Sequence, residues 1–301
     1  MTLISRLIFL TEKTLEKKSS EQIKINEISI VIPVKDNHQG IDNYLKKFFE
    51  LHTKADYPKE IIIVDNNSNH ELKLESKFKH LGLPIELIKC KKIGPASARN
   101  KGAEITKGKW ILFNDSDCIP TKSILKGYLN ADNKSVAYAG NIKSLENDKL
   151  SKYYESQEIL IPLKTYNENG DFVPQYLITA NSLIWKKAFH EVGGFNEKIT
   201  IAGGEDVDLG LRLSEIGKLS YAFDSIAIHD FSDGLIGFYK RFKRYGEGNR
   251  ILQELWKTDL KPTLFRPNKR SLVNEILAKL QYIGLKIGYK KASKQVKKYG
   301  L

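Results

Sequence analysis

The sequence predicts an α/β protein with a mostly parallel central sheet, helices on both faces of that sheet and a basic helical C-terminal extension. Short runs of β-branched and other bulky apolar residues alternate with segments of helical periodicity, a pattern typical of strand, helix, strand units. Polar and acidic residues follow several of these runs directly, as expected where parallel strands end at one edge of a sheet. Positive charge is concentrated in the last quarter of the chain, which predicts the extension.

Two strand and helix units are expected at the start of the sheet. A polar leader, residues 1–27, precedes the first predicted strand at 28–34, whose sequence ISIVIPV is apolar and β-branched. Apolar and aromatic residues at 45–52 then recur at helical spacing. The next apolar run, 61–64, predicts a second strand, and 71–80 predicts a second helix.

Three further segments complete the predicted parallel part of the sheet. Residues 84–89 predict a third strand, 96–106 a helix of small residues, and 110–114 a buried strand that ends in an acidic triplet. From 152 to 175, Pro, Asn and Gly mark loops rather than regular elements. Strand-like order returns at 178–185.

The C-terminal third is expected to be mainly helical. Apolar residues at 209–216 have helical spacing, and the acids before them fall in the first turn, where the helix dipole favours negative charge. Short strands at 219–223 and 226–228 are expected to lead into His229, and 238–256 is a long basic segment with interleaved aromatic residues. A last amphipathic helix is indicated by a stripe that comprises Leu272, Ile276, Leu277, Leu280, Ile283 and Ile287.

Composition restricts the class of protein. With 41% hydrophobic residues the chain can bury a substantial core, and Cys90 and Cys118 are too few for a disulfide framework, which favours a reducing cytoplasm. The apolar residues 7–10 lack the length and cleavage site of a signal peptide. No run of eighteen apolar residues occurs, so we expect any membrane contact to be peripheral.

The net charge of +13 is distributed very unevenly. Residues 1–230 carry 32 Lys and Arg against 31 Asp and Glu, whereas 231–301 carry 17 against 5, a net of +12. A basic tail suits an anionic partner, and residues 271–301 are the expected contact with an anionic membrane surface. The alternative is a lysine-rich helix that is merely solvated or that packs on the catalytic domain or a second subunit. No nucleic-acid recognition module is visible, so a nucleic-acid partner is not expected.

The acidic triplet Asp115, Ser116 and Asp117 is the most informative motif. Carboxylates at i and i+2 of an extended segment point the same way, and two such charges side by side call for a cation or a ring of donors. Mg²⁺ or Mn²⁺ suits these hard oxygen ligands. The alternative is an ordinary turn. Asp36 and Asp65 also follow predicted strands, so the acidic turns are expected to converge at one edge of the sheet.

Five short motifs give the chain a resemblance to a known family. They are IVIP at 30–33, IIVDNNS at 62–68, GPASARNKG at 94–102, NDSD at 114–117 and GGED at 203–206. In this order and spacing the sequence resembles the family 2 glycosyltransferases, which have a Rossmann-like GT-A fold. The resemblance covers about residues 28–230 and implies a catalytic domain over 28–232, followed by the basic extension 233–301.

The resemblance implies a nucleotide-sugar donor, expected to be a UDP-sugar. The donor would be held by Pro33, Asp65, Arg99, Asp115 and Ser116. Asp65 would contact the base or ribose, and the guanidinium of Arg99 would reach the base or a phosphate. The alternatives are a turn-initiating Asp65 and an Arg99 that forms a surface salt bridge.

The resemblance also implies a divalent cation, Mn²⁺ or Mg²⁺, with Asp117, Asp115 and His229 as the metal-binding residues. Asp117 is the expected ligand of the ion that bridges the diphosphate, whereas Asp115 would lean toward the ribose. A neutral imidazole at the end of a strand suits Mn²⁺, although His229 also fits a simple packing role.

Asp206 is the expected catalytic base, with Glu205 in reserve, and one base opposite one leaving group implies inversion at the anomeric carbon. Asp208 is interpreted as helix-start acidity.

The expected function is therefore transfer of a sugar to a hydroxyl of a glycan or lipid-linked acceptor in cell-surface polysaccharide or glycolipid biosynthesis. The expected location is the cytoplasm, peripherally on the inner face of the plasma membrane. A noncatalytic scaffold or carbohydrate-binding protein is the alternative. The sequence leaves open the sugar, the linkage and the oligomeric state.

Overall fold

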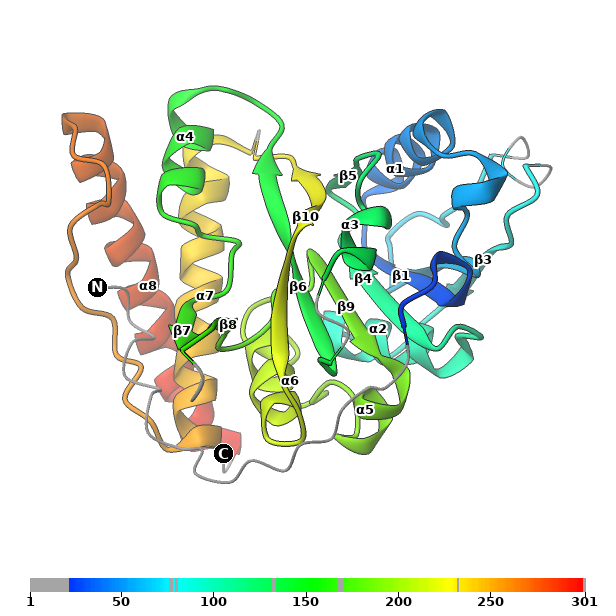
Figure 1. The fold of residues 1–301 in the computed structure, drawn as a ribbon. Coiled ribbons are helices and arrows are strands. Elements are labelled where there is room, and N and C mark those ends of the chain that lie inside the picture. The colour runs from blue at the N-terminus through cyan, green and yellow to red at the C-terminus, as the bar shows by residue number, and fades with distance from the viewer. Residues whose placement is uncertain are drawn as a thin grey trace.

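The structure is a computed structural model that describes residues 22–299, apart from 76–77, 79–80, 132–133, 167–169 and 232. Most of the predicted leader therefore lies outside the described residues. Its last residues form the short 3-10 helix Ile25–Glu27, just ahead of the first strand. Figure 1 shows a central sheet with helices packed around it and two long helices, α7 and α8, at one side.

The main sheet is mixed and mostly parallel, as the sequence predicts. Its order is β3-β2-β1-β4-β9-β6-β10-β5. Strand β9 lies antiparallel between β4 and β6, and β5 pairs antiparallel with β10. The strands are β1 Ile28–Val34, β2 Glu60–Asp65, β3 Ile85–Lys89, β4 Trp110–Asn114, β5 Cys118–Pro120, β6 Ala137–Ser144, β9 Asn181–Trp185 and β10 Leu219–His229. A separate ribbon pairs β7 Lys164–Tyr166 with β8 Phe172–Pro174.

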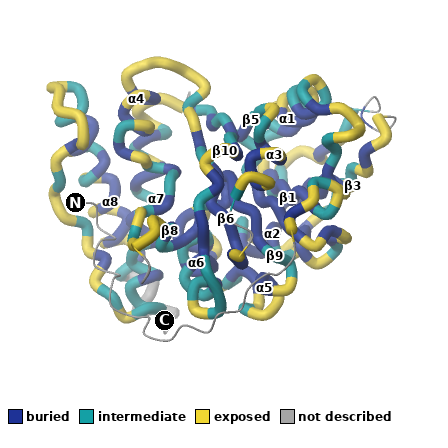
Figure 2. The backbone as a smooth tube through the Cα atoms, viewed as in Figure 1, coloured by how far each residue is buried: buried dark blue, intermediate teal, exposed yellow. Residues whose placement is uncertain are grey.

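Helices cover both faces of the sheet. They are α1 His38–Leu51, α2 Pro95–Ile105, α3 Lys126–Leu129, α4 Lys149–Ser156, α5 Lys186–Glu191, α6 Glu205–Ser214, α7 Gly234–Trp256 and α8 Leu272–Tyr299, with a short 3-10 helix at Lys54–Asp56. Alternate residues of β1 divide between two apolar clusters. Ile30 and Ile32 pack on the side of α1, α7 and α8, whereas Val31 packs on the side of α2, α5 and α6. Figure 2 shows the sheet as the buried centre between these layers.

Three local predictions differ from the structure. Among the described residues of 71–80, no α-helix forms, so that prediction is wrong. Leu72 and Leu74 both pack toward the core, and this spacing of two residues suits an extended segment, since a helix would place them on opposite sides. Glu71 in addition forms an exposed ion pair with Lys89 of β3 at 2.8 Å, so the segment lies beside the edge of the sheet.

The loop predicted at 152–175 contains regular structure. Its start belongs to α4, which is capped by Asp148 and buries Tyr153 and Tyr154 against α7. Its end forms the β7 and β8 ribbon. The two short strands predicted before His229 are one strand, β10, with an irregularity between Ala222 and Ile226.

The C-terminal extension is helical, as predicted, and it belongs to the same core as the sheet. Phe238 and Phe242 of α7, and Leu277 and Leu285 of α8, lie in the apolar cluster that also contains β1 residues. The helices α7 and α8 pack side by side, with glycines at their contact. The chain that connects them runs along the outside of this pair of helices (Figure 1). Within the described part of the chain, no helix combines the length and apolar character needed to cross a bilayer.

We predict that Gly288→Ala loosens α8 from α7. A Cβ at Gly288 would overlap the backbone carbonyl of Lys243, and backbone cannot move aside as a side chain can. The expected loss is about 1–3 kcal/mol of unfolding free energy, measured by urea titration. Ile287→Ala, at the exposed neighbouring position, is the matched control and should leave stability nearly unchanged. Equal stability of the two variants would contradict close packing at this contact.

Candidate active site

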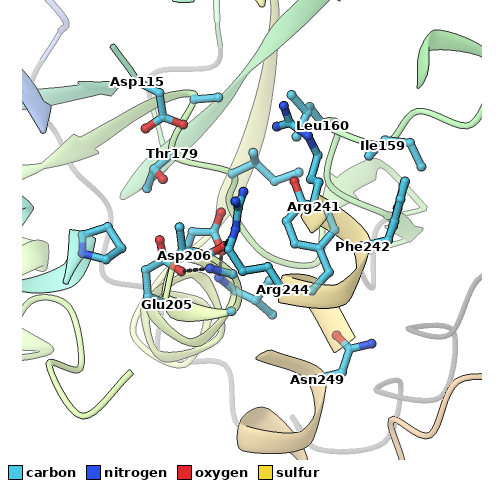
Figure 3. A pocket seen from close by; sticks show the side chains of 18 of the residues that line it. Asp115, Ile159, Leu160, Thr179, Glu205, Asp206, Arg241, Phe242, Arg244 and Asn249 are labelled. Atoms are coloured by element: carbon cyan, nitrogen blue, oxygen red, sulfur yellow. Dashed lines mark hydrogen bonds between the residues drawn. The ribbon is translucent and has the colours of Figure 1, made fainter. Parts of the chain in front are cut away.

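A cavity of about 620 Å³ opens at the carboxyl edge of the parallel strands. Its polar wall comes from the ends of β1, β2, β4 and β10 and from the first turns of α2 and α6. Its opposite wall comes from α7, α8 and the segment 157–163. Figure 3 shows Ile159 and Leu160 of this segment beside Arg241 and Phe242 of α7. Helix N-termini that face a cavity favour an anionic ligand there, because their free N–H groups and dipoles carry partial positive charge.

The acidic triplet forms the turn between β4 and β5. The side chain of Asn37, the N-cap of α1, donates to the carbonyl oxygen of Ser116 at 3.0 Å and to its hydroxyl at 3.2 Å. A Cβ at Gly40 would overlap the same carbonyl oxygen. The start of α1 therefore packs closely on the turn and hydrogen-bonds to it. Asp115, Ser116 and Asp117 all line the cavity. The triplet is both a turn and a part of the cavity wall.

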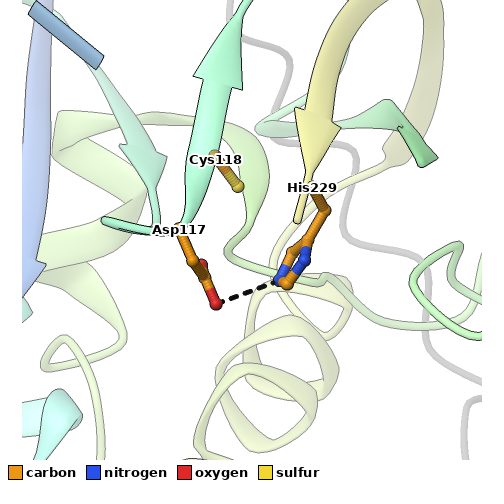
Figure 4. Close-up of side chains that lie close together, drawn as sticks. All are labelled: Asp117, Cys118 and His229. Atoms are coloured by element: carbon orange, nitrogen blue, oxygen red, sulfur yellow. Dashed lines mark ion pairs between the residues drawn. The ribbon is translucent and has the colours of Figure 1, made fainter. Parts of the chain in front are cut away.

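Asp117 faces His229 across the cavity edge (Figure 4). The distance from Asp117 Oδ2 to His229 Nε2 is 3.3 Å, and Cys118 adds a third ligand-type atom within 4.8 Å. His229 Nδ1 lies 2.8 Å from the carbonyl oxygen of Asp230, which can only accept, so Nδ1 donates and Nε2 turns toward the carboxylate. Nε2 thus directs its lone pair at the negatively charged carboxylate oxygen of Asp117. This close approach is favourable only with a proton or a cation between the two atoms.

Cys118 is a less favourable ligand than Asp117 or His229 for Mn²⁺ or Mg²⁺, because sulfur ligands suit softer metal ions. Burial, with the charges of Asp117 and Asp115, raises the pKa of its thiol well above the ordinary value. The thiol donates to the carbonyl oxygen of Ala180 at 3.6 Å. Asp117 and His229 thus fit a divalent cation such as Mn²⁺, with oxygen and nitrogen ligands and an oriented imidazole.

Arg99 joins two acidic motifs that are far apart in the sequence. Its guanidinium donates to Asp115 Oδ1 at 2.6 Å and to Glu205 Oε1 at 2.9 Å, and it packs on the ring of Phe195. The side chain is almost fully buried, so this is an internal ion network and not a surface salt bridge. Both of its terminal nitrogens are occupied by protein carboxylates, although the side chain also lines the cavity.

Glu205 and Asp206 begin α6 and have different surroundings. Both carboxylate oxygens of Glu205 are engaged, one by Arg99 and the other by the backbone N–H of Gly203 at 2.7 Å. Asp206 lines the cavity, and among the described residues its carboxylate accepts a hydrogen bond only from the adjacent backbone N–H of Val207. Desolvation and the neighbouring charge of Glu205 raise the pKa of Asp206 to about 7. Such a carboxyl group can exchange a proton near neutral pH.

Asp208 is structural. It binds Arg212 through one oxygen and accepts from the indole N–H of Trp256 at 3.0 Å through the other, which ties α6 to the end of α7.

The predicted donor residues near β1 and β2 lie at the expected edge. Pro33 lines the cavity at the end of β1. Asp65 is buried and accepts from the backbone N–H of Ser68 at 3.0 Å, so it fixes the turn after β2. The adjacent Asn66 reaches the cavity wall instead, with its amide bonded to the 90–94 loop. Asn66 was missed because its polar side chain after a strand resembles any other turn residue.

Arg241 is a second residue whose placement the sequence did not indicate. It extends from α7 into the cavity (Figure 3) and is only 8% exposed. Its guanidinium lies over the rings of Tyr154 and Phe231, and Phe231 stacks on His229 with ring centroids 4.5 Å apart. Among the described residues its Nε has no hydrogen-bond partner. In the sequence, Arg241 belongs to a basic cluster that fits either the binding of a diphosphate or anionic acceptor or a solvated helix face, and the sequence does not show that Arg241 is the buried member.

An α/β fold with a mixed sheet, and with an acidic turn that faces a cavity at the carboxyl edge of its strands, is the arrangement of the GT-A glycosyltransferases. The model of the Glycosyl transferase family 2 matches residues 29–193, more than half of the chain. A second model, the N-terminal domain of galactosyltransferase, matches residues 172–232, which include Asp206 and His229. The chain belongs to glycosyl transferase family 2.

Individual proteins agree with this assignment. The Pre-mycofactocin glycosyltransferase of Mycobacterium tuberculosis is 29% identical over 231 residues, which cover 73% of this chain and 46% of that protein. The chain thus spans less than half the length of this relative. Staphylococcus aureus TarS in complex with UDP-GlcNAc matches with a TM-score of 0.52 at 16% identity, covering 76% of this chain and 71% of that one.

A further structure has the same fold over nearly the whole chain. The Pyrobaculum calidifontis mannosyltransferase PcManGT, in complex with GDP-Man and Mn²⁺, matches with a TM-score of 0.54 at 13% identity. The match covers 93% of this chain and 76% of that one, so it includes the region of the C-terminal helices.

We predict that Arg99→Met strongly destabilises the protein. The variant leaves Glu205 and Asp115 without their shared cation, and an uncompensated buried charge costs about 3–5 kcal/mol. Urea unfolding with circular dichroism measures the change. Lys101→Met, which removes an exposed ion pair from the same helix, is the control and should leave the midpoint unchanged. Similar midpoints for both variants would show that the network adds no stability.

Proposed function

We propose that this protein is a metal-dependent, inverting glycosyltransferase that moves a sugar from a nucleotide-sugar donor to an acceptor hydroxyl. The observation that carries the proposal is the presence, in one cavity, of a cation-type pair, Asp117 and His229, and of a separate carboxyl group, Asp206, that titrates near neutrality. In a single displacement, the cation-type pair would act on the leaving diphosphate and Asp206 on the attacking hydroxyl. The solved relatives with GDP-Man and Mn²⁺ or with UDP-GlcNAc support a nucleotide-sugar donor, and we expect a UDP-sugar here.

The leaving group determines what the metal-side residues must do. The bond between the anomeric carbon and the diphosphate oxygen breaks, and its electron pair stays on the nucleoside diphosphate. Asp117 and His229 would hold a divalent cation, with Asp115 on the donor side of the same turn. When bound, the cation supplies Lewis-acid stabilisation of the departing diphosphate. Arg241 is buried beside His229, its Nη2 lies 3.5 Å from Asp233, and its Nε has no hydrogen-bond partner among the described residues. It would add a fixed positive charge on the same side.

The acceptor hydroxyl forms the new bond to the anomeric carbon and loses its proton to Asp206. A single displacement of this kind inverts the anomeric configuration. Glu205 is a poor base because both of its oxygens already accept hydrogen bonds. We assign it, together with Arg99, to the positioning of the first turn of α6, on which Asp206 is carried.

The acceptor side of the cavity has a partly apolar wall. Leu160, Ile161, Phe265 and Leu285 line it together with Arg244 and Asn249. This mixture suits a glycan or a lipid-linked acceptor, and we place the reaction in cell-surface polysaccharide or glycolipid biosynthesis. To identify the donor, the protein is incubated with Mn²⁺ and each of a panel of nucleotide sugars, and the released nucleoside diphosphate is measured.

We predict that Asp206→Asn lowers kcat by about 100-fold to 10,000-fold, because the amide cannot accept the acceptor's proton. In the wild type, kcat/KM should fall about tenfold per pH unit below pH 7, as Asp206 becomes protonated. Donor hydrolysis and transfer, followed over pH 5–9, measure both effects. Full activity of the Asn variant would exclude Asp206 as the base.

Stability provides the control for this variant. Folded Asp206 keeps its proton up to about pH 7, whereas an unfolded aspartate releases it at its ordinary, lower pKa, so the fold loses stability as pH rises between these values. Asparagine removes that loss, and the variant should melt at the same or a higher temperature than the wild type at pH 8. A variant that is stable and binds the donor but has lost the turnover of the wild type supports the catalytic role of Asp206. If the protein is a noncatalytic scaffold, the wild type will show no turnover either.

We predict that Asp117→Asn and His229→Ala each raise the Mn²⁺ concentration needed for half-maximal activity by at least about tenfold, since each removes a ligand. Calorimetric titration of Mn²⁺ in the presence of a nucleoside diphosphate measures binding independently of turnover. Cys118→Ser, within the same cluster, is the matched control and should keep the wild-type affinity because sulfur is a poor ligand for Mn²⁺ and the thiol is hydrogen-bonded to Ala180. Wild-type affinity in both ligand variants would place the cation elsewhere.

A further inference from the structure

The last helix, α8, has two faces with different surroundings. Leu277, Gln281 and Leu285 on one face are buried, and tight contacts at Gly284 and Gly288 bring this side of α8 against α7. Figure 1 shows α8 at the margin of the molecule, with α7 between it and the sheet, and buried and exposed positions alternate along it in Figure 2. The stripe recognised in the sequence therefore divides into a packed part and a part that faces outward.

The outward part is apolar over four turns. Leu272, Ile276, Ile283 and Ile287 are 80%, 56%, 46% and 42% exposed, and their spacing places them along one line of the helix. Isolated exposed apolar residues are ordinary, but an aligned set of large ones on the open face of a packed helix marks a contact surface.

Lysines border this apolar line. Lys279, Lys286 and Lys290 are exposed on the same side of the helix, whereas Lys291 is directed toward α7 by its ion pair with Glu247 at 2.9 Å. Glu275 is the one acidic residue of α8 and lies in its first turn. Beyond that turn, the exposed side chains of α8 among the described positions are all apolar or positively charged.

We propose that the outward face of α8 docks on an anionic membrane surface, with the isoleucines inserted at the headgroup boundary and the lysines among acidic headgroups. An apolar line bordered by lysines is the pattern of a helix that lies in the plane of a bilayer. A second copy of this chain fits the face less well, because a two-fold contact would bring the lysines of both copies together.

The geometry gives this docking a consequence for the cavity. Gln281 and Leu285, on the inner face of α8, line the cavity, so the helix that meets the membrane is also part of the active-site wall. Docking would hold the cavity within one helix diameter of the headgroups, where a lipid-linked acceptor presents its hydroxyl. Membrane binding itself does not depend on the transfer reaction.

Co-sedimentation of the full chain with vesicles tests the proposal. Vesicles of phosphatidylcholine with 30% phosphatidylglycerol are expected to bind at least about tenfold more protein than phosphatidylcholine alone, and salt should weaken the binding. Ile283→Ser with Ile287→Ser should reduce binding at least about tenfold, as should Lys279→Gln with Lys286→Gln and Lys290→Gln. Leu129→Ser with Leu145→Ser, which removes two exposed leucines elsewhere, is the matched control and should bind like the wild type.

Each result decides between occupants of the face. Unchanged melting temperatures and donor hydrolysis in the isoleucine variant would confirm that it is folded and that only docking is lost. Equal binding to neutral and anionic vesicles, or undiminished binding of the isoleucine variant, overturns the proposal. A dimer in solution that becomes a monomer in the isoleucine variant, without vesicle binding, assigns the face to a second copy instead.

Discussion

The buried guanidinium of Arg99 is the interaction on which the geometry of the site depends. It comes from α2 and binds the turn after β4 through Asp115 and the first turn of α6 through Glu205. Removing such charges from water costs several kcal/mol for each ion, and only their mutual pairing makes this burial acceptable. One cation and two fixed carboxylates thus hold three elements, which lie between residues 95 and 214 of the sequence, in one arrangement.

The same network explains the character of Asp206. Arg99 is shared between Asp115 and Glu205, and its positive charge lowers the pKa of Asp206 less than desolvation and Glu205 raise it. Among the described residues, Asp206 forms no ion pair of its own, and its raised pKa makes it a proton acceptor near neutral pH. The property needed for a base arises first from the desolvation of Asp206, to which the neighbouring charge of Glu205 adds.

Much of the fold could be predicted because its signals are local. Buried parallel strands such as 28–34 and 110–114 are continuous apolar runs, and the helices between them follow from spacing. The antiparallel insertion of β9 could not be predicted, because a strand's direction depends on its neighbours and leaves no mark in its own sequence. The helix predicted at 71–80 is absent from the described residues of that segment for a related reason. Contacts with the core and the edge strand β3, rather than local helix propensity, determine its extended course.

The site shows the same limit in a different form. The resemblance to the family assigned Asp115, Asp117, Asp206 and His229 to one site, and all four line the cavity in the structure. It could not show that Arg99 is occupied by protein carboxylates or that Arg241 is buried on the Phe231 and His229 stack. The match to the model of the Glycosyl transferase family 2 ends at residue 193, before Asp206, His229 and the wall formed by α7 and α8. Under the proposed mechanism, the donor side, with Asp117 and His229, and the acceptor side, with Leu160 and Leu285, therefore each combine a residue from the matched half with one from the part of the chain that follows it.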